Sequence, residues 1–357
     1  MELFAGVGGF SQGLPKTYNC VGFVENDKYA SQILRYKFPE IINYGDVTQI
    51  KPKALPDFDL LTMGAPCTSY SIMGKKKGLE DQRGQVIYSV FNILRTKKPK
   101  YFIFENVPAI LTHDNGATVE YIFSEFCKCG YYINFDILDA QNFSVPQARK
   151  RLFLIGVKQS LLEDSNDFLL KTRSRSNAII KFKERIFLND KIKLFDFKFP
   201  QRSGKQKLLQ DIVEKKVDEK YYLSKKNKQF IQRTTAISKF SNSFDHNIKL
   251  VDGTNISSTL TATNCQRLCS RGETYLLDEP VNRLHGKMFV DAKIRKFTPL
   301  ENERLQSWKD NWTKFGITTN GDKVELSDTQ RNRLIGNGLV SNIIKSIIKE
   351  MECQLKM

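Results

Sequence analysis

The sequence contains no apolar run long enough to cross a membrane. In 357 residues, no stretch approaches the roughly 20 consecutive apolar residues that a bilayer-spanning helix needs. Residues 1–4 carry no lysine or arginine, so they do not resemble the basic start of a secretory signal. Hydrophobic residues nevertheless make up 40% of the chain and aromatic residues 11%, enough for a large core and too apolar for a disordered chain. We expect a cytoplasmic protein with two domains, or with one large domain that carries an insertion.

Cysteine and histidine are too few and too scattered for a disulfide scaffold or a zinc site. The chain has seven cysteines, and an odd number spread over a long sequence is typical of a reducing compartment. Cys127 with Cys129, and Cys265 with Cys269, could each form half of a metal site. Neither pair has a second half at zinc-ligand spacing, and only three histidines are present. We therefore expect no metal.

Acidic residues are scarce relative to basic ones. Lys and Arg number 56 against 39 Asp and Glu, which gives a net charge of +17. Residues 151–250 contain 23 basic and 11 acidic residues, an excess of 12. Such a concentration suits a polyanion, most simply nucleic acid, whose phosphates basic residues neutralise. A lysine-rich solubilising surface is the alternative, and charge alone does not decide between them.

The first 157 residues alternate β-rich runs with amphipathic segments. The expected strands are 20–25, 59–63, 101–104, 132–138 and 152–157, and the expected helices include 29–37, 87–97 and 117–127. Alternation of this kind predicts an α/β fold with a doubly wound, mostly parallel sheet covered by helices on both faces. Ligands bind such sheets at the carboxyl ends of the strands.

Past about residue 178 the alternation gives way to basic, irregular segments with interleaved aromatic residues. Order returns near the end, where Ser327 with Gln330 three positions on predicts a helix start. The glycines at 336 and 338 predict a break, and residues 339–351 have apolar residues at helical spacing. This last helix needs an apolar surface to cover, which the N-terminal sheet would supply. We therefore predict that the middle region is an insertion between two parts of one domain.

A glycine-rich turn opens the chain at residues 4–10 (FAGVGGF). Closely spaced glycines after a strand let the backbone approach a ligand, although such a turn alone is weak evidence. Glu25 ends the next predicted strand, where a carboxylate can accept the hydroxyls of a ribose. Asp46 ends a plausible third strand and could accept from an adenine amino group. A turn and two acids in this order predict a site for an adenosine-type cofactor.

Further polar residues end the next predicted strands. Cys67, in the sequence GAPC, follows strand 59–63 directly after a proline, which would hold its thiol in the crevice. A cysteine hydrolase would pair the thiol with a histidine, and no histidine here lies in a recognisable pairing motif. Glu105 ends strand 101–104; alone it would suggest an ion pair or a helix cap, but beside Cys67 it is a candidate general acid. Arg149 and Arg151 alternate along an extended segment, an arrangement that suits a carbonyl oxygen or a phosphate.

Taken together, these motifs resemble the cytosine-C5 DNA methyltransferases of the bacterial restriction–modification type. The resemblance runs over nearly the whole chain, with eight motifs in the family's order. The motifs are residues 4–10, Glu25, Asp46, 64–71 around Pro-Cys, 104–107 (FENV), 147–151 (QARKR), 295–306 and 336–338 (GNG). The resemblance implies a Rossmann-like class I methyltransferase fold with a smaller inserted target-recognition domain. The catalytic domain would comprise 1–178 and 327–357, and the recognition domain 179–326.

The implied cofactor is S-adenosylmethionine. By the resemblance, Phe4 would stack on the adenine, Glu25 would hold the ribose and Asp46 would bind the adenine. The full set of implied cofactor-binding residues is Phe4, Gly6, Gly8, Gly9, Glu25, Asn26, Asp46, Val47, Pro66 and Asn337.

The resemblance also implies a reaction on a cytosine that has been flipped out of the DNA stack. Cys67 would attack C6, Glu105 would handle the proton at N3, and Arg151 would bind the O2 side. Arg149 belongs to the same implied set of catalytic residues. A thiolate at C6 makes C5 nucleophilic enough to accept a methyl group from a sulfonium. Residues 74–84 would form a loop that closes over the base, a solvated lysine-rich turn being the alternative.

Double-stranded DNA is the implied partner. Lysines across 181–228 would bind phosphates, and Gln266, Arg267 and Arg271 are candidate base readers because Gln and Arg match the major-groove edges of adenine and guanine. The implied DNA-binding residues are Ser71, Lys75, Arg83, Thr259, Leu260, Gln266, Arg267 and Arg271. A cognate restriction endonuclease in the same system is a possible further partner, and we expect a monomer.

The sequence departs from the family pattern at three places. Thr68 stands where the family often has glutamine, and Asn26 stands where an aromatic residue often covers the adenine. The first strand is also expected to be short, or the numbering to begin inside it. Two alternative functions stay open: a cytosine-C5 methyltransferase acting on tRNA, and a catalytically inactive DNA-binding relative. The first lacks its branch's Cys-Phe-Thr signature here, and the intact Cys67 and Glu105 argue against the second.

Overall fold

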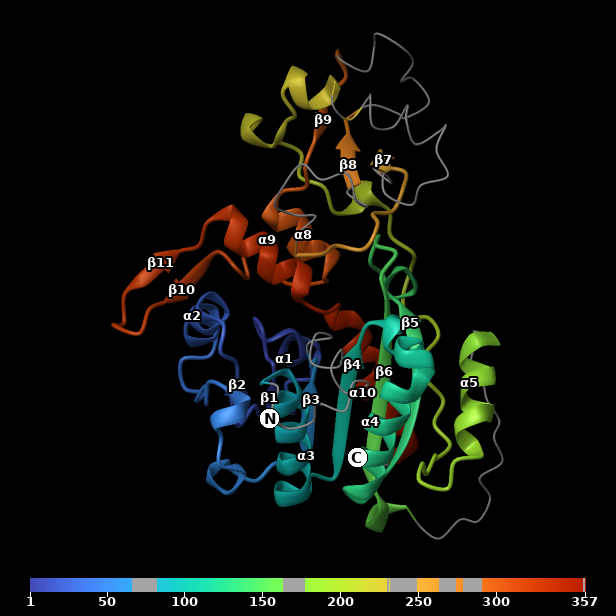
Figure 1. Ribbon diagram of the computed structural model, residues 1–357. Helices are drawn as coiled ribbons and strands as arrows, with labels where there is room; N and C mark the ends of the chain where they lie inside the picture. Colours follow the sequence, from blue (N-terminus) through green and yellow to red (C-terminus); the bar gives the residue numbers. More distant parts are fainter. Residues whose placement is uncertain are drawn as a thin grey trace. The chain divides into compact units, whose positions relative to one another are not determined.

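The computed structural model in Figure 1 describes two compact parts of this chain, each taken here by itself. The described residues are 1–65, 82–162, 177–229, 231, 249–262, 274–278, 291–355 and 357, with the backbone alone at 82–84, 177 and 178. Unit 1 contains Met1–Leu138, Lys150–Gln201 and Lys345–Met357, and unit 2 contains Asp139–Arg149 and Arg202–Ile344. These units divide the chain at other residues than the two functional domains expected from the sequence. The assignment of catalytic and recognition domains stays a prediction.

A six-stranded sheet forms the centre of unit 1, in the order β2-β1-β3-β4-β6-β5. Its strands are β1 (Glu2–Leu3), β2 (Phe23–Val24), β3 (Leu60–Met63), β4 (Tyr101–Asn106), β5 (Tyr131–Asp139) and β6 (Lys150–Lys158). Strands β2, β1, β3 and β4 are parallel neighbours, whereas β6 runs antiparallel to β4. The expected α/β class with a mostly parallel sheet is therefore confirmed.

The hydrophobic pattern located these elements well. All five expected strands overlap observed ones, and the three expected helices correspond to α2 (Lys28–Lys37), α3 (Gln82–Lys97) and α4 (Ala117–Lys128). The expected strand ending at Asp46 is reduced to a single parallel bridge beside β2. Asn43 makes only an isolated bridge to Phe23, and Asp46 instead caps a short 3-10 helix, Val47–Gln49. Its carboxylate satisfies a nearby backbone N–H and so ends the extended conformation.

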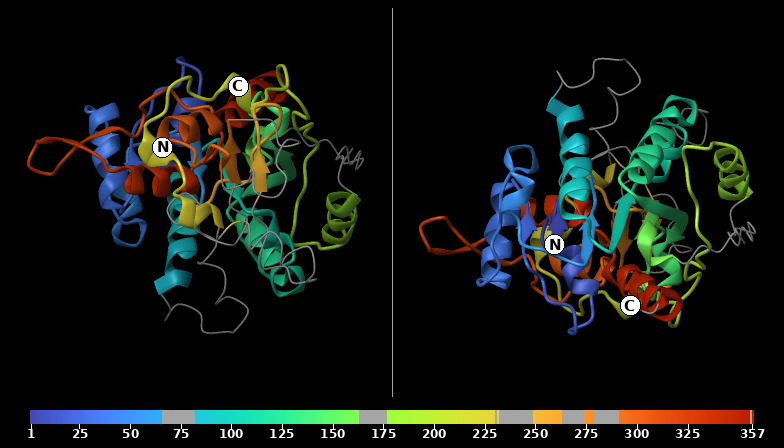
Figure 2. Two further views of the ribbon diagram at one scale, coloured as in Figure 1. Left: turned by 90° about the horizontal axis from the view of Figure 1, so that it is seen from above. Right: turned by 90° about the horizontal axis from the view of Figure 1, so that it is seen from below.

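Helices cover both faces of this sheet (Figures 1 and 2). Helices α3 and α4 lie on one face, where Phe91, Phe102 and Phe126 pack edge-on or tilted with ring centroids 4.7–5.4 Å apart. Helix α1 (Gly9–Gly13) and the part of α10 (Ser341–Leu355) that belongs to unit 1 lie on the other. The face beneath α3 and α4 contains the largest cluster of buried apolar residues, so sheet burial on both sides explains the continuous apolar strands.

A further helix, α5 (Asn177–Phe187), packs beside β5. Lys183 on this helix is buried, and its ammonium donates to Asn134 Oδ1 at 2.8 Å. Burial lowers the pKa of Lys183 to about 8, partly offset by the nearby Asp136 and Asp196. Unit 1 thus buries a lysine ammonium beside β5.

Unit 2 is built from short elements. It has a three-stranded sheet, β7 (Lys249–Val251), β8 (Thr274–Leu277) and β9 (Ile294–Arg295), and a hairpin, β10 (Phe315–Ile317) with β11 (Lys323–Glu325). Its described helices include α8 (Pro299–Leu305) and α9 (Asp328–Asn337). Ser327 caps α9 by accepting from Gln330 N, as expected, and the expected break at Gly336–Gly338 is confirmed because α10 starts at Ser341.

Candidate functional site

The glycine turn and Glu25 are joined directly in unit 1. Gly6 and Gly8 have φ values of +54° and +79°, in the left-handed region that favours glycine. Glu25 Oε2 accepts a hydrogen bond from Gly6 N at 2.7 Å, and its Oε1 accepts from Asp27 N at 2.7 Å. Burial raises the pKa of Glu25, and these backbone N–H donors oppose that rise. The carboxylate predicted from the sequence therefore lies against the predicted turn.

Glu2, on β1, holds the same turn from its buried side and was missed in the sequence. Its carboxylate accepts from Phe10 N at 3.2 Å and from Ser11 N at 3.1 Å, and the Ser11 hydroxyl donates to it at 2.5 Å. Burial raises the pKa of Glu2 to about 7, although these three donors oppose the rise. An acid at the start of a fully buried strand was the signal that could have revealed it.

Asn43 is a second residue that the sequence did not reveal. Its amide Nδ2 donates to Glu25 O at 3.0 Å, and its Oδ1 accepts from Glu25 N at 3.0 Å and from Gly45 N at 3.1 Å. Asp46 follows and accepts from Thr48 N and Thr48 Oγ1, both at 2.8 Å. Asn43 thereby ties the loop that carries Asp46 to the end of β2.

Glu105 and Arg151 meet at neighbouring strand ends. Arg151 Nε lies 3.0 Å from Glu105 Oε1, and the two side chains are 15% and 14% exposed. A methyl group added to Gly64 would lie 3.3 Å from Glu105 Oε2, so the carboxylate packs against the segment that leads to Cys67. An ion pair this well sheltered orients both groups more firmly than an exposed pair does.

Asn106 fixes the same segment. Its Nδ2 donates to Ala65 O at 2.9 Å, and its Oδ1 accepts from Val107 N at 2.9 Å. The side chain is 3% exposed, so these bonds satisfy polar groups that water cannot reach. The end of β4 is thereby tied to the backbone just before Pro66 and Cys67.

Arg149 is placed quite differently from Arg151. Its side chain is 2% exposed, and its guanidinium donates to the carbonyl oxygens of Leu260, Gly336 and Gly338 within unit 2. The two arginines were expected on one face of an extended segment. The contacts give Arg149 backbone partners within unit 2, and its expected place in the catalytic set stays a prediction.

Residues 1–353 match the sequence profile of the family described as C-5 cytosine-specific DNA methylase. The chain belongs to this family.

Two similar relatives are orphan methyltransferases of Bacillus phages. That of phage rho11s is 35% identical over 309 residues, covering 79% of this chain and 61% of the relative. That of phage SPR is 40% identical over 232 residues, covering 63% of this chain and 52% of the relative. The chain thus spans about half to three fifths of these relatives. A type II methyltransferase of Neisseria lactamica is 31% identical over 359 residues, covering 99% of this chain and 96% of the relative.

Solved structures confirm the Rossmann-like methyltransferase fold. The Entamoeba histolytica methyltransferase EhMeth aligns with a TM-score of 0.70 at 18% identity, covering 100% of this chain and 98% of that one. The S. pombe Dnmt2 methyltransferase aligns with a TM-score of 0.69 at 17% identity, again covering 100% and 98%. At these identities the likeness concerns the fold alone.

The remaining expected site residues divide into two groups. Asn26 and Asn337 are exposed, Val47 and Leu260 are buried, and Phe4 is partly buried against the core of unit 1. The others lie outside the described residues, or have a side chain that does: Pro66, Cys67, Ser71, Lys75, Arg83, Gln266, Arg267 and Arg271. Their roles stay predictions.

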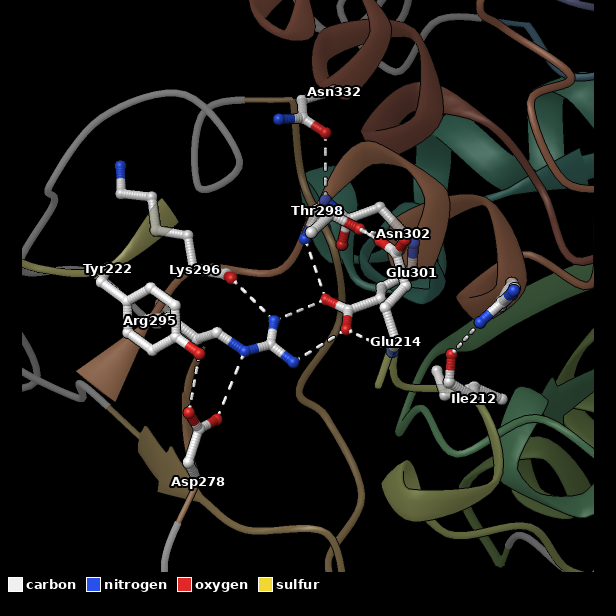
Figure 3. Close-up of polar contacts among 11 residues, drawn as sticks. Ile212, Glu214, Tyr222, Asp278, Arg295, Lys296, Thr298, Glu301, Asn302 and Asn332 are labelled. Atoms are coloured by element: carbon white, nitrogen blue, oxygen red, sulfur yellow. Dashed lines mark hydrogen bonds and ion pairs between the residues drawn. The ribbon is translucent and has the colours of Figure 1, made fainter. Parts of the chain in front are cut away.

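The motif at 295–306 forms a buried polar cluster in unit 2, shown in Figure 3. Two guanidinium nitrogens of Arg295 donate to the two oxygens of Glu301, both at 2.8 Å, and its Nε lies 3.5 Å from Asp278 Oδ1. Glu301 also caps α8 through Thr298 in a reciprocal capping box. These contacts stabilise unit 2 and do not by themselves indicate a ligand.

Among the residues that the structure describes, no group of His, Cys, Asp and Glu could hold a metal ion. The four cysteines in this part of the chain, Cys20, Cys127, Cys129 and Cys353, are free thiols. Within the same ranges, no helix is long and apolar enough to cross a membrane.

Proposed function

We propose that this protein is a DNA (cytosine-5-)-methyltransferase that transfers the methyl group of S-adenosylmethionine to C5 of a flipped-out cytosine. Family membership supports the reaction class. The observation that carries the assignment most directly is the Glu105–Arg151 pair packed against Gly64, three residues before Cys67. This places an acid and a cation beside the segment that would bring a thiol to the same base.

The glycine turn fits the adenosine part of the cofactor. A methyl group added to Gly6 would meet no atom within 4 Å, and the same holds for Gly45, two residues after Asn43. Open space therefore lies beside the backbone at both glycines. The carboxylate of Glu25, which accepts from Gly6 N, would hold the ribose. Phe4, Asp46, Val47, Pro66 and Asn337 complete the proposed set. When bound, S-adenosylmethionine supplies an electrophilic methyl group on a sulfonium.

The protein's own residues would prepare the cytosine for that methyl group. The Cys67 thiolate adds to C6, and its electron pair passes into the ring, which makes C5 nucleophilic. Glu105 holds a proton at N3, and Arg151 binds the O2 side, so the charge that develops on the ring is stabilised. After transfer, the C5 proton passes to water, and the electron pair of the C5–H bond re-forms the C5–C6 double bond and expels the Cys67 sulfur. The base must leave the stack first, because neither C5 nor C6 can be reached within it.

A methyl-transfer assay tests this proposal. Incubation with tritiated S-adenosylmethionine and duplex DNA should label the DNA as 5-methylcytosine, and equal amounts of tRNA should not compete. Cys67→Ala should abolish labelling, while Cys353→Ala, which changes a free exposed thiol of α10, should leave it unchanged. If Cys67→Ala methylates normally, the covalent mechanism is wrong, and preferential labelling of tRNA would favour the RNA alternative.

A trapping experiment separates an active enzyme from an inactive DNA-binding relative. DNA that contains 5-fluorocytosine should form a covalent complex, because fluorine cannot leave C5 as a proton does and Cys67 therefore stays attached. Bisulfite sequencing of DNA from expressing cells should then show the methylated sequence. A complex that never becomes covalent would indicate the inactive relative.

Partners and assembly complete the proposal. We propose double-stranded DNA as the substrate and a monomer as the active form, which size-exclusion chromatography with light scattering would measure. A cognate restriction endonuclease would be revealed if methylated DNA resists cleavage by an extract of the source cell, whereas unmethylated DNA is cut.

A further inference from the structure

Two segments far apart in the sequence run side by side within unit 2. Ala148 N donates to Ser257 O at 2.9 Å, and Ser257 N donates to Pro146 O at 2.8 Å. The Thr259 hydroxyl donates to Ala148 O at 2.6 Å. Residues 257–262, called here the recognition segment, are thereby attached along residues 146–149 and lead to the predicted base readers.

Gln147 strengthens the attachment from a fully buried position. Its Oε1 accepts from Leu260 N at 3.0 Å, and its Nε2 donates to Leu305 O at 2.7 Å. Both ends of the amide are thus used to hold backbone. Because the side chain is 0% exposed, water cannot replace either bond.

Arg149 connects the recognition segment to a third part of unit 2. One guanidinium nitrogen, Nη1, donates to Leu260 O at 2.6 Å, and the other, Nη2, donates to Gly338 O and, at 3.4 Å, to Gly336 O. Its planar fork therefore spans the recognition segment and the turn at residues 336–338. Lysine cannot reproduce this geometry, because an ammonium is a point charge without a fork.

Direct packing joins the same two parts. A methyl group added to Gly336 would overlap the backbone of Thr261 and Ala262, and one added to Gly338 would overlap the Trp308 ring. The Trp308 indole N–H donates to Leu339 O at 3.1 Å. The turn and the recognition segment are thus in contact without an intervening side chain.

We propose that Arg149 is a positioning residue that couples DNA binding to cofactor binding by holding the recognition segment against the 336–338 turn. The proposal rests on the proposed function and on the roles that the family resemblance implies, with Thr259 and Leu260 binding DNA and Asn337 binding S-adenosylmethionine. The two terminal guanidinium nitrogens of Arg149 donate to backbone carbonyls, with the side chain 2% exposed, and we assign the contact with the cytosine to Arg151. Each ligand would then favour the arrangement that the other needs.

A binding cycle measures this coupling. The Kd of S-adenosylhomocysteine is determined by calorimetry with and without a duplex that the wild-type protein methylates. We expect the duplex to tighten S-adenosylhomocysteine about tenfold in the wild-type protein, within the usual range for coupled sites. In Arg149→Lys the factor should fall below about twofold, and both KM values should rise while kcat stays within about threefold.

Arg295→Lys is the matched control. Arg295 is equally buried in unit 2 at 2% exposure, but it holds the carboxylates of Glu301 and Asp278 and the carbonyl of its neighbour Lys296. Among the described residues, no bond of its side chain reaches the recognition segment or the 336–338 turn. The Arg295→Lys variant should have a lower melting temperature than the wild type and should keep the tenfold coupling. If Arg149→Lys does not fold, Thr259→Val, which removes the hydroxyl bond to Ala148 O, should show an intermediate coupling factor. The factor is measured at saturating duplex, so that a loss of DNA affinity at Thr259 does not enter it.

Three results would overturn the inference. The first is that the duplex does not tighten S-adenosylhomocysteine binding in the wild-type protein. The second is full coupling in a folded Arg149→Lys or in Thr259→Val, and the third is a loss of kcat in Arg149→Lys with coupling intact. The last result would make Arg149 a catalytic residue. Failure of the proposed function is distinguishable, because it shows as absent methyl transfer by the wild-type protein, whatever the binding cycle gives.

Discussion

Replacing Asn106 with alanine should impair catalysis far more than its effect on stability predicts. The change removes the donor to Ala65 O and the acceptor for Val107 N, both at 2.9 Å. A buried polar group left without its partner costs about 1–3 kcal/mol. If that energy positions the Cys67 segment in the transition state, kcat should fall roughly 5- to 150-fold, since about 1.4 kcal/mol corresponds to a factor of ten.

Asn134 offers a control with the same chemistry elsewhere in the sheet. Its Nδ2 donates to Phe195 O at 2.6 Å, and its Oδ1 accepts from Phe135 N at 2.7 Å. Asn134→Ala also removes the acceptor for Lys183, so it should destabilise unit 1 at least as much. For a domain of about 200 residues, each kcal/mol lowers the melting temperature by about 2–4 °C.

The assay is single-turnover transfer of tritiated methyl groups, measured beside thermal unfolding of both variants. We expect both to lose melting temperature, whereas only Asn106→Ala loses rate and Asn134→Ala stays within about twofold of the wild type. Equal rates in the two variants would show that the bond to Ala65 does not position the catalytic segment.

Three further predictions test other parts of unit 1. Glu25→Gln places an amide N–H₂ against the N–H of Gly6 or Asp27, so the Kd of S-adenosylmethionine, measured by calorimetry, should rise about tenfold or more. An unchanged Kd would show that Glu25 does not bind the cofactor. Burial raises the pKa of Glu2 from 4.5 to about 7, so folding binds a proton and the free energy of unfolding should fall as pH rises through this range. Urea unfolding at pH 5 and pH 8 should show this fall, about 2 kcal/mol, in the wild type and not in Glu2→Gln. The pKa of Lys183 is lowered from 10.5 to about 8, so the folded state loses this proton first and the free energy of unfolding of the wild type should rise between pH 8 and 10.5. Urea unfolding of Lys183→Met should show no such rise and a higher free energy of unfolding than the wild type at pH 7. A Lys183→Met variant that is less stable than the wild type at pH 7 would contradict the argument.

Much of unit 1 could be predicted because its signals are local. A buried parallel strand is a short apolar run, and polar residues directly after such runs lie together because parallel strands end at one edge. Glu25 beside the glycine turn, and Glu105 at the end of β4, follow from this rule. Asp46 shows its limit. Its short side chain bonds to Thr48, and a pattern that predicts extended backbone does not register that competing local bond.

The sequence by itself therefore determined the fold class, the order of the motifs and the strand ends at which the acids lie. It could not separate Arg149 from Arg151, since alternate residues of an extended segment point to the same side. Only the tertiary structure decided that one pairs with Glu105 while the other holds carbonyls 111 and 189 residues away. The same holds for Glu2, Asn43 and Asn106, each of which bonds to two or more backbone groups. Every residue carries the same backbone N–H and C=O, so no residue type in the sequence marks which of them a buried side chain will meet.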